Sequence, residues 1–273
     1  MEFSMTYELI KYLCNMISKA TVKLIHSLGL KKNRDKEGLF VAEGPKVVAD
    51  LLAVASPLHL IATSEWFAGH RMEMNQWGKV KISEVTEDEL RKASFQKTPQ
   101  QVIGVFPIPE TEAQDTATDM PGRQLCLALD GVQDPGNLGT IIRIADWFGI
   151  EHVYCSEDTA DAYNPKVVQA TMGSIARVKV HSINLPQFIT HLPEGVPIYG
   201  TLLDGQNIYT QELSANGLIV MGNEGKGISE EIRKLVTHKL FIPSFPPDTD
   251  TAESLNVAIA TAVTCAEFRR RIS

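Results

Sequence analysis

Short apolar runs alternate with amphipathic segments along the second half of this 273-residue chain. The runs have the length and the continuous apolar character of buried strands. The expected strands are 125–132, 152–156, 196–203, 217–223 and 239–244. The segments between them carry apolar residues at helical spacing, and the expected helices are 140–149, 165–176, 228–236 and a long one from Ser254. Strands that alternate with helices predict an α/β fold with a parallel sheet covered on both faces.

In such sheets, ligands bind beyond the carboxyl ends of the strands. The loops after Val132, Leu203, Val220 and Ile242 are therefore the expected places for a site. The first half of the chain is patterned differently, with an amphipathic helix expected at 46–55 and β-type runs at 58–63 and 101–106. We expect a second, smaller α/β unit there.

Residues 107–122 (PIPETEAQDTATDMPG) separate the two halves. They hold three prolines and four acids, with no basic and no aromatic residue. This composition is typical of a linker. The predicted organisation is a first domain over 16–106, an acidic linker over 107–122 and a second domain over 123–273.

Composition narrows the class of protein. Apolar residues make up 44% and charged residues 22%, which excludes disordered, collagen-like and disulfide-scaffold proteins. The four cysteines form no CxxC pair, so neither a zinc site nor a disulfide framework is indicated. No apolar stretch approaches the ~20 residues of a membrane span, and the start lacks the basic segment of a signal peptide. We expect a cytoplasmic protein with no membrane partner.

The net charge of −7 excludes a uniformly basic surface, so nucleic-acid binding would require a local basic segment. Such a segment lies between residues 19 and 36, which contain six basic residues and a single acidic residue, Asp35. The charge run alone favours a solvated helix face. The alternative is a patch that contacts phosphates through Lys19, Lys23, Lys31, Lys32, Arg34 and Lys36.

Three segments of the second half contain candidate chemistry. The first is the NxGxxxR spacing of Asn137, Gly139 and Arg143, where Asn137 is a candidate helix cap and Arg143 a candidate grip for a phosphate. The second is the glycine-rich VMGNEGKGIS at 220–229, which is neither a Walker loop nor a dinucleotide fingerprint. The third is ESLNVAIATAVTCAEFRRR at 253–271, in which Ser254 is a natural N-cap. Each alone also has a purely structural explanation.

Taken together and in this order, the three motifs resemble those of the SpoU/TrmH family of RNA ribose methyltransferases. The resemblance covers about 123–271. Upstream, RDKEGLFVAEGPKVVADLL at 34–52 and TPQQVIGVF at 98–106 resemble the small substrate-binding domain that often precedes this catalytic domain. Because of this resemblance, an RNA contact becomes the favoured interpretation of the basic segment at residues 19–36. Because family-like sequence begins near Met16, residues 1–15 are interpreted as an extension, with an added helix on the first domain as the alternative.

The resemblance implies a trefoil-knotted catalytic domain, dimerisation through the knot and S-adenosylmethionine as cofactor. The polar residues that it places at the reaction centre are Asn137, Arg143, Glu224, Ser254 and Asn256. The cofactor-binding residues that it implies, mainly through their backbone groups, are Thr201, Leu202, Gly222, Asn223, Gly225, Gly227, Ile242 and Leu255. One departure concerns the cofactor site: this chain has a long IPSFPPDTDTAE segment at 242–253 where relatives have a short link.

The chemistry also follows from general principles. A ribose hydroxyl is a poor nucleophile and a methyl sulfonium is already activated, so the protein must align the two and assist proton loss, and no metal is required. Because a guanidinium stays protonated, we expect Arg143 to hold a phosphate and stabilise the developing alkoxide, with Asn137, Ser254 or a water passing the proton. The predicted substrate is ribosomal RNA, with transfer RNA as the alternative. A non-catalytic RNA-binding or ribosome-assembly factor of the same fold is the rival, and a nicotinamide enzyme is a distant third.

Overall fold

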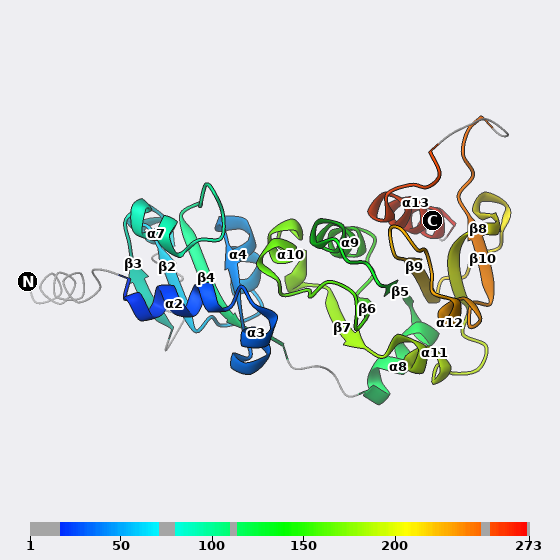
Figure 1. Ribbon diagram of the computed structural model, residues 1–273, viewed down its shortest axis with the longest axis horizontal. Helices are drawn as coiled ribbons and strands as arrows, with labels where there is room; N and C mark the ends of the chain where they lie inside the picture. Colours follow the sequence, from blue (N-terminus) through cyan, green and yellow to red (C-terminus); the bar gives the residue numbers. More distant parts are fainter. Residues whose placement is uncertain (1–16, 71–79, 110–113, 247–251, 272–273) are drawn as a thin grey trace, which may run out of the picture. The chain divides into compact units, whose positions relative to one another are not determined.

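The computed structural model describes residues 17–70, 80–109, 114–246 and 252–271 (Figure 1). Its contacts separate two compact units. The first contains the described residues up to Pro109 together with Tyr163–Ala176, and the second contains the described residues of 110–162 and of 177–273. The extension predicted for residues 1–15 lies outside the described residues. The other predicted domain boundaries remain a proposal.

The first unit is built on a four-stranded sheet with the order β1-β4-β2-β3. Its strands are β1 (Leu39–Glu43), β2 (His59–Ala62), β3 (Lys81–Glu84) and β4 (Val102–Pro107). Its helices are α2 (Lys19–Ser27), α3 (Lys31–Glu37), α4 (Pro45–Leu52), α5 (Ser64–Gly69), α7 (Glu87–Ala93) and α10 (Pro165–Ala170), with a 3₁₀ turn η1 (Ser174–Ala176). β1 and β2 both run antiparallel to β4, and β2 runs parallel to β3, so β1, β2 and β3 point the same way.

The second unit is built on a six-stranded parallel sheet with the order β10-β8-β9-β5-β6-β7. Its strands are β5 (Leu125–Asp130), β6 (His152–Ser156), β7 (Lys179–Ile183), β8 (Ile198–Asn207), β9 (Gly217–Gly222) and β10 (His238–Phe241). The two central strands are almost wholly apolar and buried, as expected where helices cover both faces. The predicted parallel α/β sheet is confirmed.

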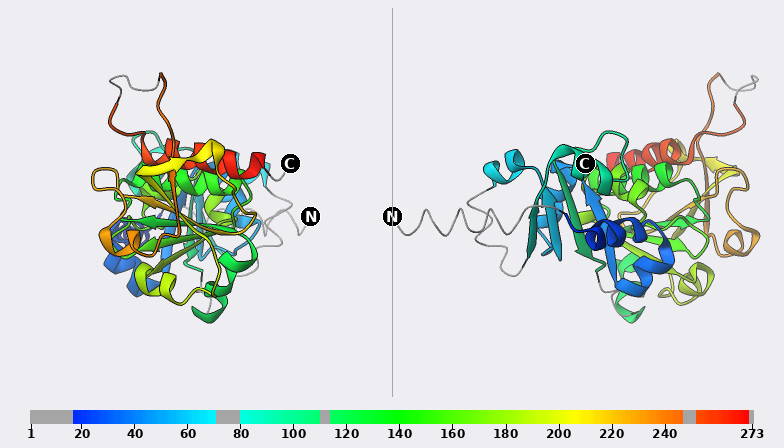
Figure 2. Two further views of the ribbon diagram at one scale, coloured as in Figure 1. Left: turned by 90° about the vertical axis from the view of Figure 1, so that its right-hand side faces the viewer. Right: turned by 60° about the vertical axis from the view of Figure 1, so that its left-hand side comes forward.

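Helices cover both faces of this sheet. α9 (Pro135–Trp147) and α13 (Val257–Arg270) pack together on one face, while α8 (Gln114–Arg123), α11 (Leu185–Thr190) and α12 (Glu230–Arg233) lie on the other (Figures 1 and 2). A second 3₁₀ turn, η2 (Ile208–Thr210), follows β8. Apolar residues of β5, β9, α11 and α12 form one contiguous buried cluster.

Several expected elements differ from the structure in their bounds, and two of the differences have a clear physical reason. The helix expected over 165–176 ends at Ala170, because Met172 and Gly173 adopt left-handed backbone angles before η1 begins. The segment interpreted as a linker contains α8 in its second half, and Met120 packs against the apolar cluster of the second unit. Composition alone could not indicate this helix, since an acidic segment fits an exposed linker and a helix with one exposed face equally well.

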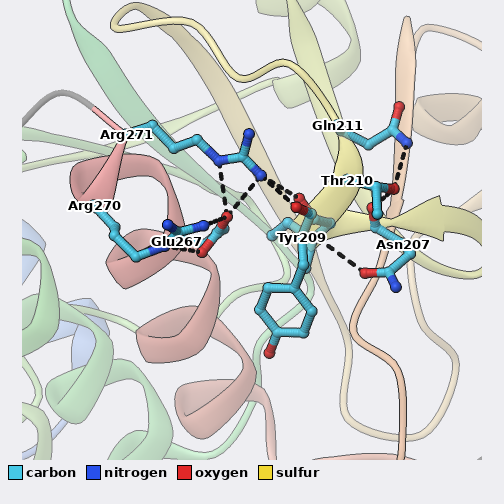
Figure 3. A network of polar contacts seen from close by, with 8 residues as sticks. Asn207, Tyr209, Thr210, Gln211, Glu267, Arg270 and Arg271 are labelled. Atoms are coloured by element: carbon cyan, nitrogen blue, oxygen red, sulfur yellow. Dashed lines mark hydrogen bonds and ion pairs between the residues drawn. The ribbon is translucent and has the colours of Figure 1, made fainter.

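The C-terminal end of α13 is held by a buried carboxylate (Figure 3). Glu267 is only 5% exposed and accepts hydrogen bonds from Arg270 and Arg271 at 2.8–2.9 Å. Arg271 also donates to the Tyr209 carbonyl at 2.6 Å, which ties the helix end to η2. The hydrogen bond from Arg270, followed by that from Arg271, lowers the pKa of Glu267 despite its burial.

No helix among the described residues is long and apolar enough to cross a membrane.

Candidate active site

The loops after β5 and β9 meet because these strands are neighbours in the sheet. Asp130, the last residue of β5, pairs with Gly222, the last residue of β9. The Asp130 carboxylate accepts the Ser229 backbone N–H at 2.6 Å, and the Asn223 side-chain amide donates to the Gly131 carbonyl at 2.6 Å. These two bonds fasten the glycine-rich loop to the end of β5 and to the loop that leads into α9, the helix that carries the NxGxxxR motif.

The glycine-rich loop folds back on itself. Asn223 and Gly227 exchange two backbone hydrogen bonds of 2.9 Å, and the Asn223 carbonyl oxygen Oδ1 accepts the N–H groups of Gly225 and Lys226. A Cβ on Gly222 would lie 2.2 Å from the Gly227 carbonyl carbon, so no larger residue fits there without backbone movement. Gly227 has a φ of +70°, which favours glycine.

Three polar residues from distant segments form a hydrogen-bonded chain. The Asn137 Nδ2 group donates to Glu224 Oε1 at 2.9 Å, and the Asn256 Nδ2 group donates to Asn137 Oδ1 at 2.9 Å. Glu224 also accepts longer bonds, of 3.4–3.5 Å, from the backbone N–H groups of Asp134 and Gln133. The structure thus brings together three of the five residues that the sequence motifs place at the reaction centre.

The helix caps beside this chain differ from the sequence prediction. Asp134, not Asn137, caps α9: its Oδ1 accepts the Asn137 N–H at 2.8 Å, and Pro135 occupies the first helical position. Asn256, not Ser254, caps α13 by accepting the N–H groups of Ala258 and Ile259. Both predictions were wrong because more than one residue near each helix start is a good cap. The Asp-Pro pair was the available signal for α9.

Arg143 and Ser254 stand apart from the chain. Arg143 lies on the exposed face of α9, and among the described residues its guanidinium makes no hydrogen bond or ion pair. Ser254 is exposed two residues before the cap of α13. No hydrogen bond within the described segments joins either residue to Asn137, Glu224 or Asn256. Both side chains are therefore available to an incoming substrate.

Most of the predicted cofactor residues lie within β8, at the end of β9 or in the segments that follow β9 and β10. Pairing between β8 and β10 moves from Gly200 opposite Lys239 to Gln206 opposite Leu240, so residues 201–205, which include Thr201 and Leu202, form a bulge. Thr201 donates to the Val220 carbonyl at 3.3 Å, next to the end of β9. Ile242 directly follows β10 and is half-buried, and Leu255 is 51% exposed just before α13.

The basic segment lies on α2 and α3 of the first unit. Five of its six bases are exposed, and two of them form exposed ion pairs, Lys31 with Asp35 and Lys36 with Glu37. Arg34 is the exception: it is 1% exposed and donates to the Leu28 carbonyl at 2.7 Å. The prediction that Arg34 contacts RNA is wrong, because the side chain holds the α2–α3 turn together instead.

Comparison with known proteins decides the family. The model of the SpoU rRNA Methylase family matches residues 124–266, which is more than half of the chain. The chain belongs to this family. The resemblance that its motifs indicated is confirmed, and a model of the MRM3-like substrate binding domain matches residues 19–104.

Relatives of this SpoU-family protein match it along most of its length. It is 34% identical to the 23S rRNA (guanosine(2553)-2′-O)-methyltransferase RlmP of Bacillus subtilis, over 89% of this chain and 93% of that protein. The structure resembles an AdoMet-bound rRNA methyltransferase from Sinorhizobium meliloti, with a TM-score of 0.82 and 31% identity over 93% of this chain and 96% of the other. It also resembles a putative TrmH-family RNA methyltransferase from Porphyromonas gingivalis, with a TM-score of 0.80 and 38% identity over 94% and 99% of the two chains.

One site residue was missed by the sequence interpretation. Asp130 is 8% exposed and pins the N-terminal end of the α12 segment through Ser229. Its position as an acid at the carboxyl end of a buried strand was the signal that could have revealed it.

Proposed function

We propose that this protein transfers a methyl group from S-adenosylmethionine to a ribose 2′-oxygen of ribosomal RNA, with 23S rRNA as the preferred substrate. The proposal rests on the hydrogen-bonded chain of Glu224, Asn137 and Asn256, which links all three motif segments of a SpoU-family domain. The similarity to RlmP over nearly the whole length supports 23S rRNA. Transfer RNA remains the alternative substrate.

The residues present fit the proposed cofactor. Half-buried Leu202 in the bulge of β8, half-buried Ile242 directly after β10 and the exposed Leu255 before α13 offer apolar contact for an adenine ring. Thr201 lies in the same bulge of β8, while Gly222 ends β9 and Asn223, Gly225 and Gly227 follow it. S-adenosylmethionine would supply a methyl group on a sulfonium, an activated electrophile that needs no metal. The chain's own task is to hold the ribose oxygen in line with it.

Glu224 acts by positioning. Its carboxylate accepts a hydrogen bond from the Asn137 side-chain N–H, and the Asn137 side-chain oxygen accepts one from Asn256. The loop after β9 thereby fixes the start of α13. Both ends of the Asn137 side chain are thereby engaged. Of the predicted proton carriers, this leaves Ser254 or a water as the better candidates.

Arg143 is proposed to bind RNA at the reaction centre. A planar guanidinium on an exposed helix face can hold the phosphate next to the target ribose with two parallel hydrogen bonds. The same positive charge stabilises the alkoxide that develops as the ribose hydroxyl loses its proton. Since a guanidinium stays protonated, it does not serve as the base.

Further parts of the proposal concern the assembly and its location. We propose a cytoplasmic homodimer that associates through a C-terminal trefoil knot. Leu255, just before α13, and Ile259, in its first turn, support the association, because these apolar side chains are 51% and 53% exposed. Sedimentation velocity on the purified protein tests it: a dimer is expected, and a monomer at micromolar concentration would contradict it.

A transfer assay tests the proposed activity. Purified protein is incubated with [methyl-³H]S-adenosylmethionine and either 23S rRNA or bulk transfer RNA from a strain that lacks the gene. We expect label in 23S rRNA, recovered as a 2′-O-methylated nucleoside. Label in transfer RNA would transfer the proposal to the alternative substrate, and label on a base would overturn the reaction. Calorimetry that detects no S-adenosylmethionine binding would favour the non-catalytic rival.

A further inference from the structure

The first unit contains a cavity that the proposed catalytic site does not use. Its volume is about 710 Å³, within the range of small-ligand sites. It lies where β1, β2 and β3 end: in its wall, Thr63 and Val85 directly follow β2 and β3, and Pro45 comes two residues after the end of β1. The carboxyl ends of co-directional strands are the usual place for a ligand in such sheets.

The wall combines flat apolar surface with opposite charges. Pro45 and Pro99 contribute ring faces, and Lys97 contributes a cation. Lys97 is exposed and forms no ion pair within the part of the chain that the structure describes. Glu65 and Glu87, in the first turns of α5 and α7, contribute carboxylates. Arg91 contributes a second cation, which is paired with Asp88 at 2.7 Å.

The loop that forms one wall of the cavity, residues 97–101, is anchored at both ends. Before it, the buried Glu43 carboxylate accepts the Phe95 N–H at 2.8 Å and a short hydrogen bond from the Ser94 hydroxyl. At its end, the Gln101 carbonyl accepts the Thr63 N–H at 2.9 Å. Gln101 has a φ of +47°, an unfavourable conformation for a residue other than glycine. The anchors hold the loop in this conformation and keep the cavity open.

This mixture of groups selects the kind of ligand. A bare phosphate would meet like charge at both carboxylates, and of the two cations in the wall the Arg91 guanidinium is already engaged by Asp88. An unpaired nucleotide suits the wall better, since its phosphate can meet Lys97, its base can lie against the proline rings and its N–H groups can donate to the carboxylates. Sequence-specific RNA recognition commonly uses such unstacked bases.

We propose that this cavity binds one unpaired nucleotide of the RNA substrate and so contributes to target selection. The inference rests on the proposed function, in which RNA is the substrate. It assigns base recognition to the cavity and leaves sequence-independent phosphate contacts to the exposed lysines of α2 and α3.

Two variants of the full-length protein test the cavity with an unmodified in vitro transcript of 23S rRNA as the probe. Thr98→Trp fills the cavity from its exposed rim without changing charge. Its control is Val54→Trp, at a residue that is 60% exposed in the same unit but is not part of the cavity wall. Lys97→Gln removes the cation, and Lys81→Gln, at the opposite end of β3, is its control.

We measure the Kd for the transcript at several salt concentrations by filter binding, and the melting temperature of each variant by circular dichroism. Thr98→Trp should raise the Kd about tenfold or more without changing its salt dependence, because a base contact is lost. Lys97→Gln should raise the Kd and reduce the slope of log Kd against log salt by about 1. Both controls should bind as wild type does.

Folded Thr98→Trp and Lys97→Gln variants with wild-type Kd values would overturn the proposal, as would a wild-type protein that does not bind the transcript. The methyl-transfer assay separates the two proposals. If wild type binds the transcript but methylates no RNA, the proposed function fails while the cavity is still tested by the Kd values. If wild type methylates 23S rRNA and both variants bind it normally, only the cavity assignment fails.

Discussion

Gly222→Ala should disrupt the proposed site through a single methyl group. The new Cβ would lie 2.2 Å from the Gly227 carbonyl carbon and 2.3 Å from the Ile228 nitrogen, whereas ordinary contact begins near 3.4 Å. The end of β9 and residues 227–228 must therefore move apart by about 1.2 Å. That movement strains the paired hydrogen bonds between Asn223 and Gly227 and displaces Glu224, which holds Asn137.

A misplacement of about 1 Å at a reaction centre costs about 10²-fold in rate. We therefore expect kcat/KM for methyl transfer from [methyl-³H]S-adenosylmethionine to 23S rRNA to fall about 100-fold. Gly225→Ala is the comparison for folding, because its Cβ would meet only Asn223 Oδ1, at 3.8 Å. Its melting temperature should equal that of wild type, while that of Gly222→Ala should fall. A Gly222→Ala protein with wild-type rate and melting temperature would refute the reasoning.

Three further predictions test separate parts of the account. Arg143→Lys keeps the charge but loses the planar fork, so the transfer rate should fall at least about tenfold with an unchanged S-adenosylmethionine Kd from calorimetry; a wild-type rate would remove the proposed role. Burial, followed by the charge of Lys81, lowers the pKa of His59 from 6.5 to about 4. The unfolded chain therefore binds a proton between about pH 6.5 and 4 that the folded protein does not, and stability falls as the pH falls through this window. Urea midpoints should fall less in His59→Asn than in wild type over that range, and equal losses would contradict the assignment. Burial raises the thiol pKa to about 12 at Cys126, Cys155 and Cys265. At pH 8, N-ethylmaleimide should therefore label these cysteines in urea but not in the folded protein, as measured by peptide mapping. Rapid labelling of the folded protein would contradict this prediction.

Five of the six strands of the second unit could be predicted from the sequence, because buried strands are rich in apolar residues. The edge strand β7 was missed, since its alternating residues KVHSI are only partly buried. Leu125–Asp130 and Gly217–Gly222 are almost continuous apolar runs, as strands covered on both faces must be. The order of the strands could not be predicted in the same way. The contact between the loops that follow β5 and β9 depends on these strands being neighbours, although more than eighty residues separate them.

The sequence predicted which polar residues belong to the candidate active site, but not the hydrogen bonds between them. Motif order identified Asn137, Glu224 and Asn256, while the hydrogen bonds that join them depend on where α13 begins relative to β9. Local rules also failed to choose between neighbouring caps, since Ser254 and Asn256 are both good N-caps and tertiary contact with Asn137 favours the second.

Counting charges along the sequence assigned Arg34 to the RNA-contacting patch and did not reveal the cavity of the first unit. Arg34 belongs to the basic run, yet its carbonyl partner lies in the adjacent turn, which no count of charges reveals. The cavity of the first unit gave no sequence signal, because its wall is assembled from residues scattered between Pro45 and Gln101. Only the fold brings them together.

The central claim is that this protein methylates a ribose of ribosomal RNA. The most direct measurement maps alkali-resistant linkages in total RNA from cells with and without the gene. We predict that one linkage in 23S rRNA becomes alkali-sensitive when the gene is deleted and regains resistance when the wild-type gene, but not the Gly222→Ala gene, is restored. Identical linkage maps in both strains, or the loss of a base methylation instead, would contradict the account.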